Sequence, residues 1–453
     1  MAAGPAVDAL ALQYQGRAVF IEQNVDAPIG NRISRFWAAF NDGTAYLPLV
    51  ILDSGHRIET GDLGNFTTVF QSLVEAELTR PPQAEIEAYA RQVGTRMRVY
   101  VRLHNTSGTT LSASTNQAAL HALVYEDAHV GVTGRIMRAA PWLDLTSPLA
   151  QDGVTSATLD TDVLSGVAWN ALHTVVVVDY VPGAGLAFDM LQAAVAQPAG
   201  LTVEPSTLRV GVDSGHLADR TVPITLAGPY TLSWTAVPDV PWLVLTPDEA
   251  AIATRPAVTV AAGGLARGPQ EGHVTFSATS QDGMAFTQFL TVTAVLGPRQ
   301  LRAVAGPVTP GSPIALPIVM SALGDEHEVS FSLTFDPVML RAPSVAPGSA
   351  ASAATLAVDD SEASAGRLGI TLTLPAAQTF PEGDDQLAVV TFATATTVPR
   401  PNTVVTFSDQ PMARSITDGF GSPLTAAVEG TTLVFPDASV LRVVRRHLQH
   451  SGR

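Results

Sequence analysis

The chain has 453 residues, a length at which we expect three or four domains. Hydrophobic residues make up 46% of it, which is enough for packed cores and excludes a disordered chain. The net charge is -16, and all 25 basic residues are arginine. Because basic residues cluster only in the last dozen positions, the charge argues against nucleic acid as a partner.

The chain contains no cysteine, which excludes disulfides, thiolate metal sites and dithiol chemistry. No apolar run approaches the roughly 18 residues that a transmembrane helix needs, so we predict no transmembrane segment. Residues 1–17 carry neither a basic region nor a continuous apolar core and do not resemble a signal peptide. We expect either a cytoplasmic chain or one whose natural start lies upstream, and we favour the second.

Residues 1–80 are the only segment with a mixed α/β pattern. Apolar spacing predicts helices at 7–14, 32–40 and 66–78 and strands at 18–22, 47–52 and 57–60. The strand that contains Pro48 is followed by a Ser54-Gly55 turn, a second strand and a C-terminal helix. This order resembles the second half of a thioredoxin-like fold, where the residue matching Pro48 is a cis-proline beside the redox centre.

The resemblance to thioredoxin-like proteins covers only part of that fold. The family's first strand and its Cys-x-x-Cys helix should precede Val7, and both are absent. We therefore interpret residues 1–80 as a truncated or degenerate thioredoxin-like segment without redox activity. The alternative for Pro48 is an ordinary proline at the start of a strand.

Residues 83–197 change to a pattern of short strands separated by turns. We predict these strands at 96–104, 119–125, 134–139, 156–163 and 172–181. The last of them is apolar on both faces and is expected at the centre of a sheet. The pattern favours an immunoglobulin-like β-sandwich. The stretch 188–195 is predicted to be either a further strand or a short helix.

Residues 200–296 predict a second sandwich that contains Trp234 and Trp242. The segment 241–247 (PWLVLTP), the strand 257–260 (AVTV) and a glycine before the alternating run 272–276 together resemble a BACON-type module. That resemblance implies carbohydrate or mucin binding, or a spacer beside an enzyme. Sugars stack on exposed aromatic faces, so Trp234 and Trp242 are the carbohydrate-binding candidates. The alternative is that both are buried core tryptophans.

Residues 298–437 carry the clearest strand of the chain. Between 329 and 335 the apolar residues alternate strictly with hydroxyl residues, which gives a strand one buried and one solvated face. Strands are also predicted at 314–320, 366–374, 385–392, 403–407 and 426–435. This order, with the motif SFSLTFDPVML, resembles a cohesin-like jelly-roll module. Cohesins of cellulosomes bind dockerins, and no paired calcium loop of a dockerin occurs in this chain.

No residue pattern in the chain indicates a catalytic or metal site. The adjacent pairs Asp359-Asp360 and Asp384-Asp385 diverge and do not suit the paired carboxylates of a glycosidase. Calcium is the ion that such acidic loops could hold. The ten histidines lack the spacing of zinc ligands. Ser54 and His56 could approach each other only if the turn that carries them curled tightly.

The sequence therefore predicts a mainly β protein in which tandem Ig-like and cohesin-like jelly-roll sandwiches follow a small α/β segment. Residues 438–453 form a basic tail. The first functional hypothesis is a non-enzymatic exported or cell-surface protein that binds polysaccharide or a surface protein. The second is an interaction scaffold whose cohesin-like module binds a dockerin-type protein. The third is the C-terminal part of a redox or hydrolytic enzyme whose catalytic half is missing.

Overall fold

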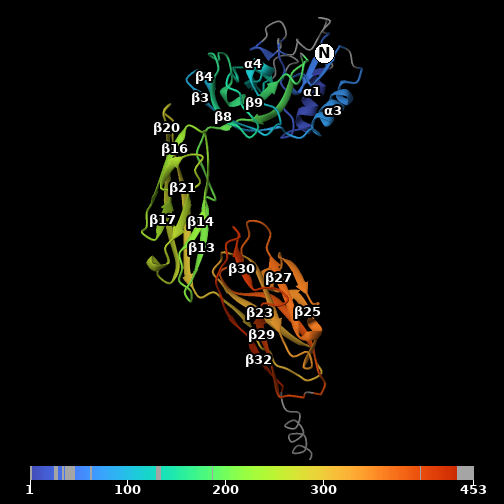
Figure 1. Ribbon diagram of the computed structural model, residues 1–453, viewed down its shortest axis with the longest axis vertical. Coiled ribbons are helices and arrows are strands. Elements are labelled where there is room, and N and C mark those ends of the chain that lie inside the picture. The colour runs from blue at the N-terminus through green and yellow to red at the C-terminus, as the bar shows by residue number, and fades with distance from the viewer. Residues whose placement is uncertain are drawn as a thin grey trace, which may run out of the picture.

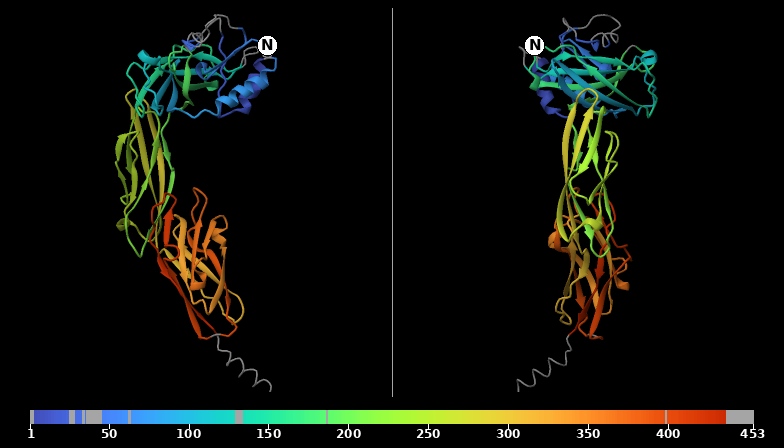
Figure 2. Two further views of the ribbon diagram at one scale, coloured as in Figure 1. Left: turned by 45° about the vertical axis from the view of Figure 1, so that its right-hand side comes forward. Right: turned by 90° about the vertical axis from the view of Figure 1, so that its left-hand side faces the viewer.

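The computed structural model describes residues 3–24, 29–32, 35, 46–61, 64–128, 134–185, 187–397 and 399–435. These residues form a small α/β unit and three β-sandwiches, which confirms the mainly β fold class (Figure 1). The second and third sandwiches follow one another along the long axis, and the first lies across the end of the second (Figure 2). The predicted tail 438–453 and most of the predicted helix 32–40 lie outside the described residues.

The N-terminal unit packs two helices against one hairpin. Its elements are α1 (Ala3–Gln13), β1 (Leu49–Leu52), β2 (Arg57–Thr60) and α3 (Phe66–Glu77). Asn65 caps α3 by accepting a hydrogen bond of 3.1 Å from the amide of Thr68. Leu10 of α1 meets Phe70 and Val74 of α3 in the core of this unit. The unit is thus held together by the apolar faces of its two helices.

The predicted strand 18–22 is wrong. Only Glu22 makes a β-bridge, to Ile136 of strand β6 (Ile136–Ala139). The amide of Glu22 donates to the carbonyl of Arg135 over 3.1 Å, and its carbonyl accepts from Met137 over 2.9 Å. Residues 18–21 belong to no strand, so their apolar side chains are placed by a single bridge and not by a ladder.

The first sandwich consists of two antiparallel sheets with a short parallel addition. One sheet has the order β10 (Asp189–Val195), β9 (Leu172–Tyr180), β5 (Ala119–Glu126) and β6, and β7 (Trp142–Asp144) also pairs with β5. The other has the order β11 (Gln197–Pro198), β3 (Ala84–Val93), β4 (Arg96–Asn105) and β8 (Val154–Asp160). A short helix, α4 (Ala113–Asn116), precedes β5. The open choice at 188–195 is thus decided in favour of a strand.

Strand β9 is central, as its sequence predicts, and both of its faces are buried. Val176 and Val178 belong to the core between the two sheets of the first sandwich. Val175 and Val177 belong to a separate cluster on the outer side, against which Ile21 and Ile29 pack. The N-terminal unit therefore covers the outer face of this sheet, which explains the uninterrupted apolar run.

The second sandwich contains two main sheets and a two-stranded addition, β12 (Thr202–Glu204) with β15 (Thr225–Ala227). The larger sheet has the order β13 (Thr207–Asp213), β21 (Ala285–Gly297), β20 (Gly268–Ser280), β16 (Leu232–Pro238) and β18 (Glu249–Ala251). The smaller has the order β14 (Arg220–Pro223), β19 (Ala257–Val260) and β17 (Leu243–Thr246). The core of the second sandwich contains both Trp234 and Trp242.

The third sandwich contains two sheets of mostly antiparallel strands. One sheet has the order β25 (Leu340–Pro347), β28 (Gly383–Thr394), β23 (Ile314–Ala322), β22 (Gln300–Ala303) and β31 (Ala427–Glu429). The other has the order β26 (Thr355–Asp359), β27 (Arg367–Thr373), β24 (Glu326–Thr334), β29 (Asn402–Ser408) and β32 (Thr431–Val434), and β30 (Ser415–Asp418) also pairs with β24. β22 and β31 run parallel.

The alternating run at 329–335 folds as its pattern predicts. Val329, Phe331 and Leu333 are fully buried, and Phe335 is nearly so. Phe331 meets Phe407 edge to face at 5.5 Å between ring centroids. These side chains lie between the two sheets of the third sandwich and join them.

We predict that Phe331→Ala destabilises the third sandwich by about 3–5 kcal/mol, because it removes a fully buried ring and leaves a cavity. Urea unfolding of the full chain measures the loss. Thr406→Ala changes an exposed residue of the same sheet and is the matched control, with an expected change within about 0.5 kcal/mol. Equal losses in the two variants would contradict this account of the core.

Candidate functional site

The two tryptophans proposed for carbohydrate binding are buried. Trp234 is 1% exposed and Trp242 is 5% exposed. The indole Nε1 of Trp234 donates to the carbonyl of Ala251 over 3.1 Å, and its ring packs against Phe276. Neither indole offers a face on which a sugar could stack. The carbohydrate-binding assignment of these residues is therefore wrong, because both anchor the core of the second sandwich.

The other residues singled out in the sequence are also accounted for. The Leu47–Pro48 peptide bond is cis. Ser54 Oγ accepts a hydrogen bond of 3.0 Å from Arg32, whereas His56 Nδ1 lies 2.9 Å from a carboxylate oxygen of Glu77. Ser54 and His56 are thus each bound to a different partner, and the structure shows no catalytic pair there.

The acidic pairs bind neighbouring side chains. Asp359 accepts hydrogen bonds from the backbone and the hydroxyl of Ser361, and Asp384 accepts from Ser321 and pairs with Arg302. Among the described residues, no three His, Asp or Glu side chains gather in a way that could hold a metal ion. The calcium site expected at these loops therefore gains no support from their geometry.

The most concentrated buried charge lies where one module meets the next. The first such place joins the N-terminal unit to the first sandwich at Asp179, which is fully buried. Its carboxylate lies 2.5 Å from Arg32, 2.7 Å from Arg35 and 3.2 Å from Nε2 of His121. Burial alone would raise the pKa of Asp179, but the hydrogen bond from His121 and the positive charge of Arg32 hold it below its usual range.

A second ion-pair group lies beside the first and ties the N-terminal unit to β10. Arg80 contacts Asp189 at 2.7 Å, Glu77 at 2.9 Å and Asp53 at 3.2 Å. Burial, together with the neighbouring Glu77 carboxylate, raises the pKa of Asp53 to about 6. One arginine thus contacts three carboxylates. Asp53 holds a proton more readily than Glu77, because burial would raise the pKa of Glu77 but the hydrogen bonds that it accepts lower it.

The joint between the first and second sandwiches is built around Asp282. This residue lies in the turn between β20 and β21 and contacts the outer face of β3 and β4. It accepts hydrogen bonds from Tyr100 and, over 3.1 Å, from Arg98, and it pairs with Arg91 at 3.4 Å. Burial alone would raise the pKa of Asp282, but the hydrogen bonds that it accepts hold it below its usual range.

Tyr100 links the cores of these two sandwiches. Although it lies on β4 of the first sandwich, it is 1% exposed and packs within the core cluster of the second. Tyr230 meets it nearly edge-on at 6.5 Å between ring centroids, and the Tyr230 hydroxyl lies 3.0 Å from that of Thr158. The joint therefore combines apolar burial with the Asp282 contacts.

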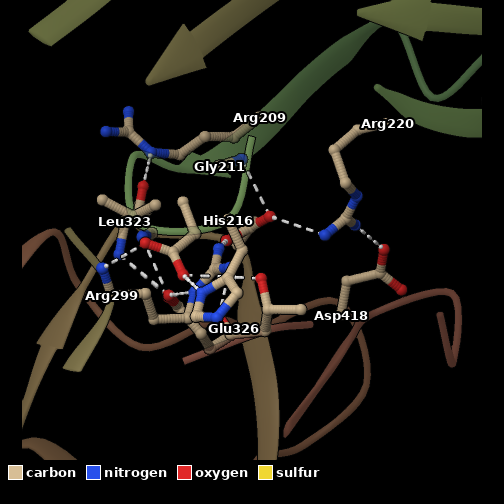
Figure 3. Close-up of polar contacts among 12 residues, drawn as sticks. Arg209, Gly211, His216, Arg220, Arg299, Leu323, Glu326 and Asp418 are labelled. Carbon is tan, nitrogen blue, oxygen red and sulfur yellow. Dashed lines mark hydrogen bonds and ion pairs between the residues drawn. The ribbon is translucent and has the colours of Figure 1, made fainter. Parts of the chain in front are cut away.

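The joint between the second and third sandwiches is centred on Arg299 (Figure 3). Arg299 follows β21 in the short connection to β22 and is 1% exposed. Its Nη2 lies 2.5 Å from Asp325, its Nε 2.5 Å from Glu326, and its Nη1 donates to the carbonyl of Thr425 over 3.2 Å. A planar guanidinium can satisfy several acceptors at once in this way, which an ammonium group does not match.

Asp325 and Glu326 also accept hydrogen bonds from backbone amides, Asp325 from the second sandwich and Glu326 from the third. Asp325 accepts a hydrogen bond of 2.8 Å from the amide of Gly211 in the second sandwich. Glu326 accepts from the amides of Leu323 and Gly324, over 2.9 Å and 3.0 Å. A Cβ at Gly211 would lie 2.5 Å from Nη2 of Arg299, so only glycine permits this approach.

Two further arginines of the second sandwich close the rim of the joint. Arg209 donates to the carbonyl of Leu323 over 3.0 Å (Figure 3). It also pairs with Glu382. Arg220 pairs with Asp418 at 2.6 Å. Each of these three contacts joins the second sandwich to the third, so together they restrain rotation of one module against the other.

A cleft of about 250 Å³ opens beside Arg299. Asp213 lines it and is already engaged, since it accepts from the amide of Gly215 over 2.9 Å and lies 3.0 Å from Nδ1 of His216. Small-molecule sites usually occupy about 300–1,000 Å³. Among the described residues that line this cleft, none is an activated nucleophile. We therefore interpret the cleft as part of the charged joint between the two sandwiches.

Sequence reasoning did not identify these joints. Their members are far apart in the chain, as Arg220 and Asp418 show, and each is an ordinary charged residue in its own segment. Two local signals were present: Arg299 directly follows the dipeptide Gly297-Pro298 at the start of the predicted third sandwich, and Asp325-Glu326 lies just before the alternating run at 329–335. Charged residues next to linkers are where such joints can be sought.

We predict that Arg299→Met lowers the free energy of unfolding of the third sandwich by about 3–5 kcal/mol, because Asp325 and Glu326 lose their buried counter-charge. Thermal and urea unfolding of the full chain measure it. Arg341→Met, at an exposed arginine of the same sandwich, is the control. An unchanged stability of the Arg299 variant would contradict the role assigned to this joint.

We predict a pH-dependent effect at Asp53. Its pKa is raised when folded, so its contribution to stability is present near pH 4 and is lost as the pH rises through about 6. Asp53→Asn stays neutral and should be as stable as the natural chain at pH 4 but roughly 1–3 kcal/mol more stable at pH 7.

Urea unfolding at the two pH values tests the Asp53 prediction. Asp162→Asn, at a fully exposed carboxylate, controls for the loss of one negative charge. If the free energies of unfolding of the Asp53 variant and the natural chain differed by the same amount at both pH values, the prediction would be wrong.

Comparison with known proteins gives a partial likeness. No family model and no curated protein matches the chain. Among solved structures, it is similar to a non-cellulosomal cohesin from Archaeoglobus fulgidus, with 16% identity over 32% of this chain and 97% of that one, at a TM-score of 0.26.

Two bacterial cohesins show the same partial likeness. The sixth cohesin of scaffoldin B from Acetivibrio cellulolyticus, solved in complex with a dockerin, is 18% identical over 31% of this chain and 99% of that one, with a TM-score of 0.27. CaCohA2 from Clostridium acetobutylicum is 15% identical over 31% of this chain and 94% of that one, with a TM-score of 0.26. Within the described residues, no helix has the length and apolar character needed to cross a membrane.

Proposed function

We propose that the chain is a non-enzymatic interaction scaffold that presents the third sandwich to a partner protein. The observation that carries this proposal is that charged contacts cross each successive joint while one sheet of the third sandwich keeps its outer side clear of the neighbouring module. A protein built in this way holds a binding surface at a fixed position relative to its other modules.

This surface is the outward side of β26, β27, β24 and β29, which we call the outer face. Residues paired across these strands share it, as the register of Thr355 with Thr373 and of Thr334 with Thr406 shows. Short hydroxyl side chains dominate the outer face. The joint with the second sandwich uses the loops at one end of the third sandwich and leaves this face free (Figure 1).

The composition of the outer face suits a polypeptide partner. Serine and threonine hydroxyls both donate and accept, so they can pair with backbone and side-chain groups at low cost in side-chain entropy. Val404 adds an exposed apolar contact on β29. A dockerin-type protein and an extracellular or cell-surface location, both expected from the cohesin-like sequence pattern, are the finer parts of this proposal.

We predict that the outer face determines partner capture. The full chain, immobilised and exposed to envelope and secreted fractions of its source, should retain a stoichiometric protein. Ala357→Arg and Thr406→Arg place a bulky charge on exposed positions of that face and should reduce capture at least tenfold. Thr235→Arg, on an exposed position of the second sandwich, should not. Equal capture by all variants would refute the outer face as the binding surface.

A second candidate function is polysaccharide binding by the second sandwich, at a place other than its tryptophans. Phe289 on β21 is 58% exposed. Across the sheet it is paired with Thr275, which in turn is paired with the exposed Val237. An exposed ring among hydroxyl side chains can stack on the C–H face of a sugar. Binding of the full chain to an insoluble polysaccharide, if Phe289→Ala abolished it, would support this second function. Binding that the substitution left unchanged would exclude Phe289 as the site.

A further inference from the structure

The outer face carries an internal occupant. Residues 409–414, which we call the strap, connect β29 to β30 and cross β24 and β27. The hydroxyl of Ser332 donates to the carbonyl of Met412 over 2.7 Å and accepts from its amide over 2.8 Å. Ser332 is therefore fully buried, although its place in the alternating strand predicts a solvated side chain.

The side chain of Met412 occupies a socket at Gly369. A Cβ at position 369 would lie 2.6 Å from Cγ and 2.7 Å from Sδ of Met412, so a side chain there would expel the methionine. The hydroxyl of Thr371 lies 3.7 Å from the same sulfur. The socket is thus formed by Gly369, Ser332 and Thr371, in the middle of a face that otherwise presents hydroxyl groups.

The remaining contacts of the strap are weak. Arg414 forms a two-point ion pair with Asp409, at 2.7 Å and 3.0 Å, within the strap itself. Gln410 accepts a hydrogen bond of 3.3 Å from Arg367. Both contacts are at the surface, where water competes for the groups and the contacts add little stability. The strap is therefore held on the sheet chiefly by Ser332 and by the Met412 side chain.

We propose that the strap is a displaceable plug and that the Gly369 socket is the anchor point for the partner protein. This inference rests on the proposed function of the outer face. The strap shows what the socket accepts: an apolar side chain without a branch at Cβ over Gly369, and the backbone amide and carbonyl of that same residue on Ser332. Only a polypeptide supplies this combination, so the partner presents a peptide segment with a methionine or leucine.

A peptide with the strap's own sequence, SDQPMARSI (residues 408–416), tests the proposal without the natural partner. Its binding to the full chain is measured by fluorescence anisotropy. Met412→Gly empties the socket and should bind the peptide at least tenfold more tightly than the natural chain, in which the strap competes. Met412→Leu, which keeps an apolar plug, is the matched control and should behave as the natural chain.

Filling the socket supplies the reverse test. Adding Gly369→Val to the Met412→Gly variant should abolish peptide binding, because the valine side chain occupies the space of the methionine. No peptide binding by Met412→Gly, or equal binding by all four proteins, would overturn the proposal. Met412 lies outside the core of the third sandwich, so a cooperative thermal transition should show that its variants are folded.

Hydrogen exchange in the natural chain gives a readout that needs no substitution. The Met412 amide should exchange at least tenfold faster than the amides of β24, because the strap opens while the sheet stays intact. Exchange as slow as that of β24 would show a permanent cover and refute the plug. A partner captured equally by the natural chain and by Gly369→Val would refute the socket while leaving the proposed function of the outer face intact.

Discussion

The arrangement of this protein depends on charged and polar contacts that cross module boundaries. The joint at Arg299 is the clearest case: this guanidinium is 1% exposed and is stable there because carboxylates surround it. Two of those carboxylates, Asp325 and Glu326, come from the third sandwich, and Asp325 in turn binds the backbone of the second at Gly211. Rotating one sandwich against the other would break the hydrogen bond between Gly211 and Asp325 and would separate Arg220 from Asp418. The relative orientation of the two modules is thereby fixed.

Charged contacts also cross the other two joints, each with a carboxylate at its centre, of which Asp179 is fully buried and Asp282 lies at the surface. Asp179 receives two arginines between the N-terminal unit and the first sandwich, and Asp282 receives two arginines and a tyrosine between the first and second. Apolar contact accompanies each pairing, as Tyr100 shows by packing in the core of the neighbouring module. Short linkers alone would leave such sandwiches free to move. The charges convert a series of modules into one extended unit.

The sequence predicted the strands well, and the reason is physical. Alternation of apolar and hydroxyl residues at 329–335 leaves a strand only one way to face a core, and the structure places those side chains there. The apolar run in β9 indicated burial on both faces, although nothing in the run identified the N-terminal unit as the cover. The segment 18–22 failed because apolar residues predict burial but do not by themselves supply a partner strand.

The candidate sites could not be predicted in the same way. Trp234 and Trp242 were chosen for their residue type, and burial, which decides whether an indole can bind a sugar, depends on the whole sandwich. The joints and the strap join residues from distant segments, as Ser332 and Met412 do, and a single sequence contains no signal for such pairs. Gly369 illustrates the limit: the sequence shows a glycine in a strand, and only the fold shows what that glycine accommodates.

The central claim is that the joints hold the modules rigidly, and a distance measurement tests it most directly. Because the natural chain has no cysteine, one cysteine at Thr235 and one at Thr406 allow spin labels to be placed on the second and third sandwiches without background. Pulsed electron–electron double resonance then reports the distribution of distances between them. A rigid joint at Arg299 predicts one narrow peak. A broad distribution, or several peaks, would contradict the account.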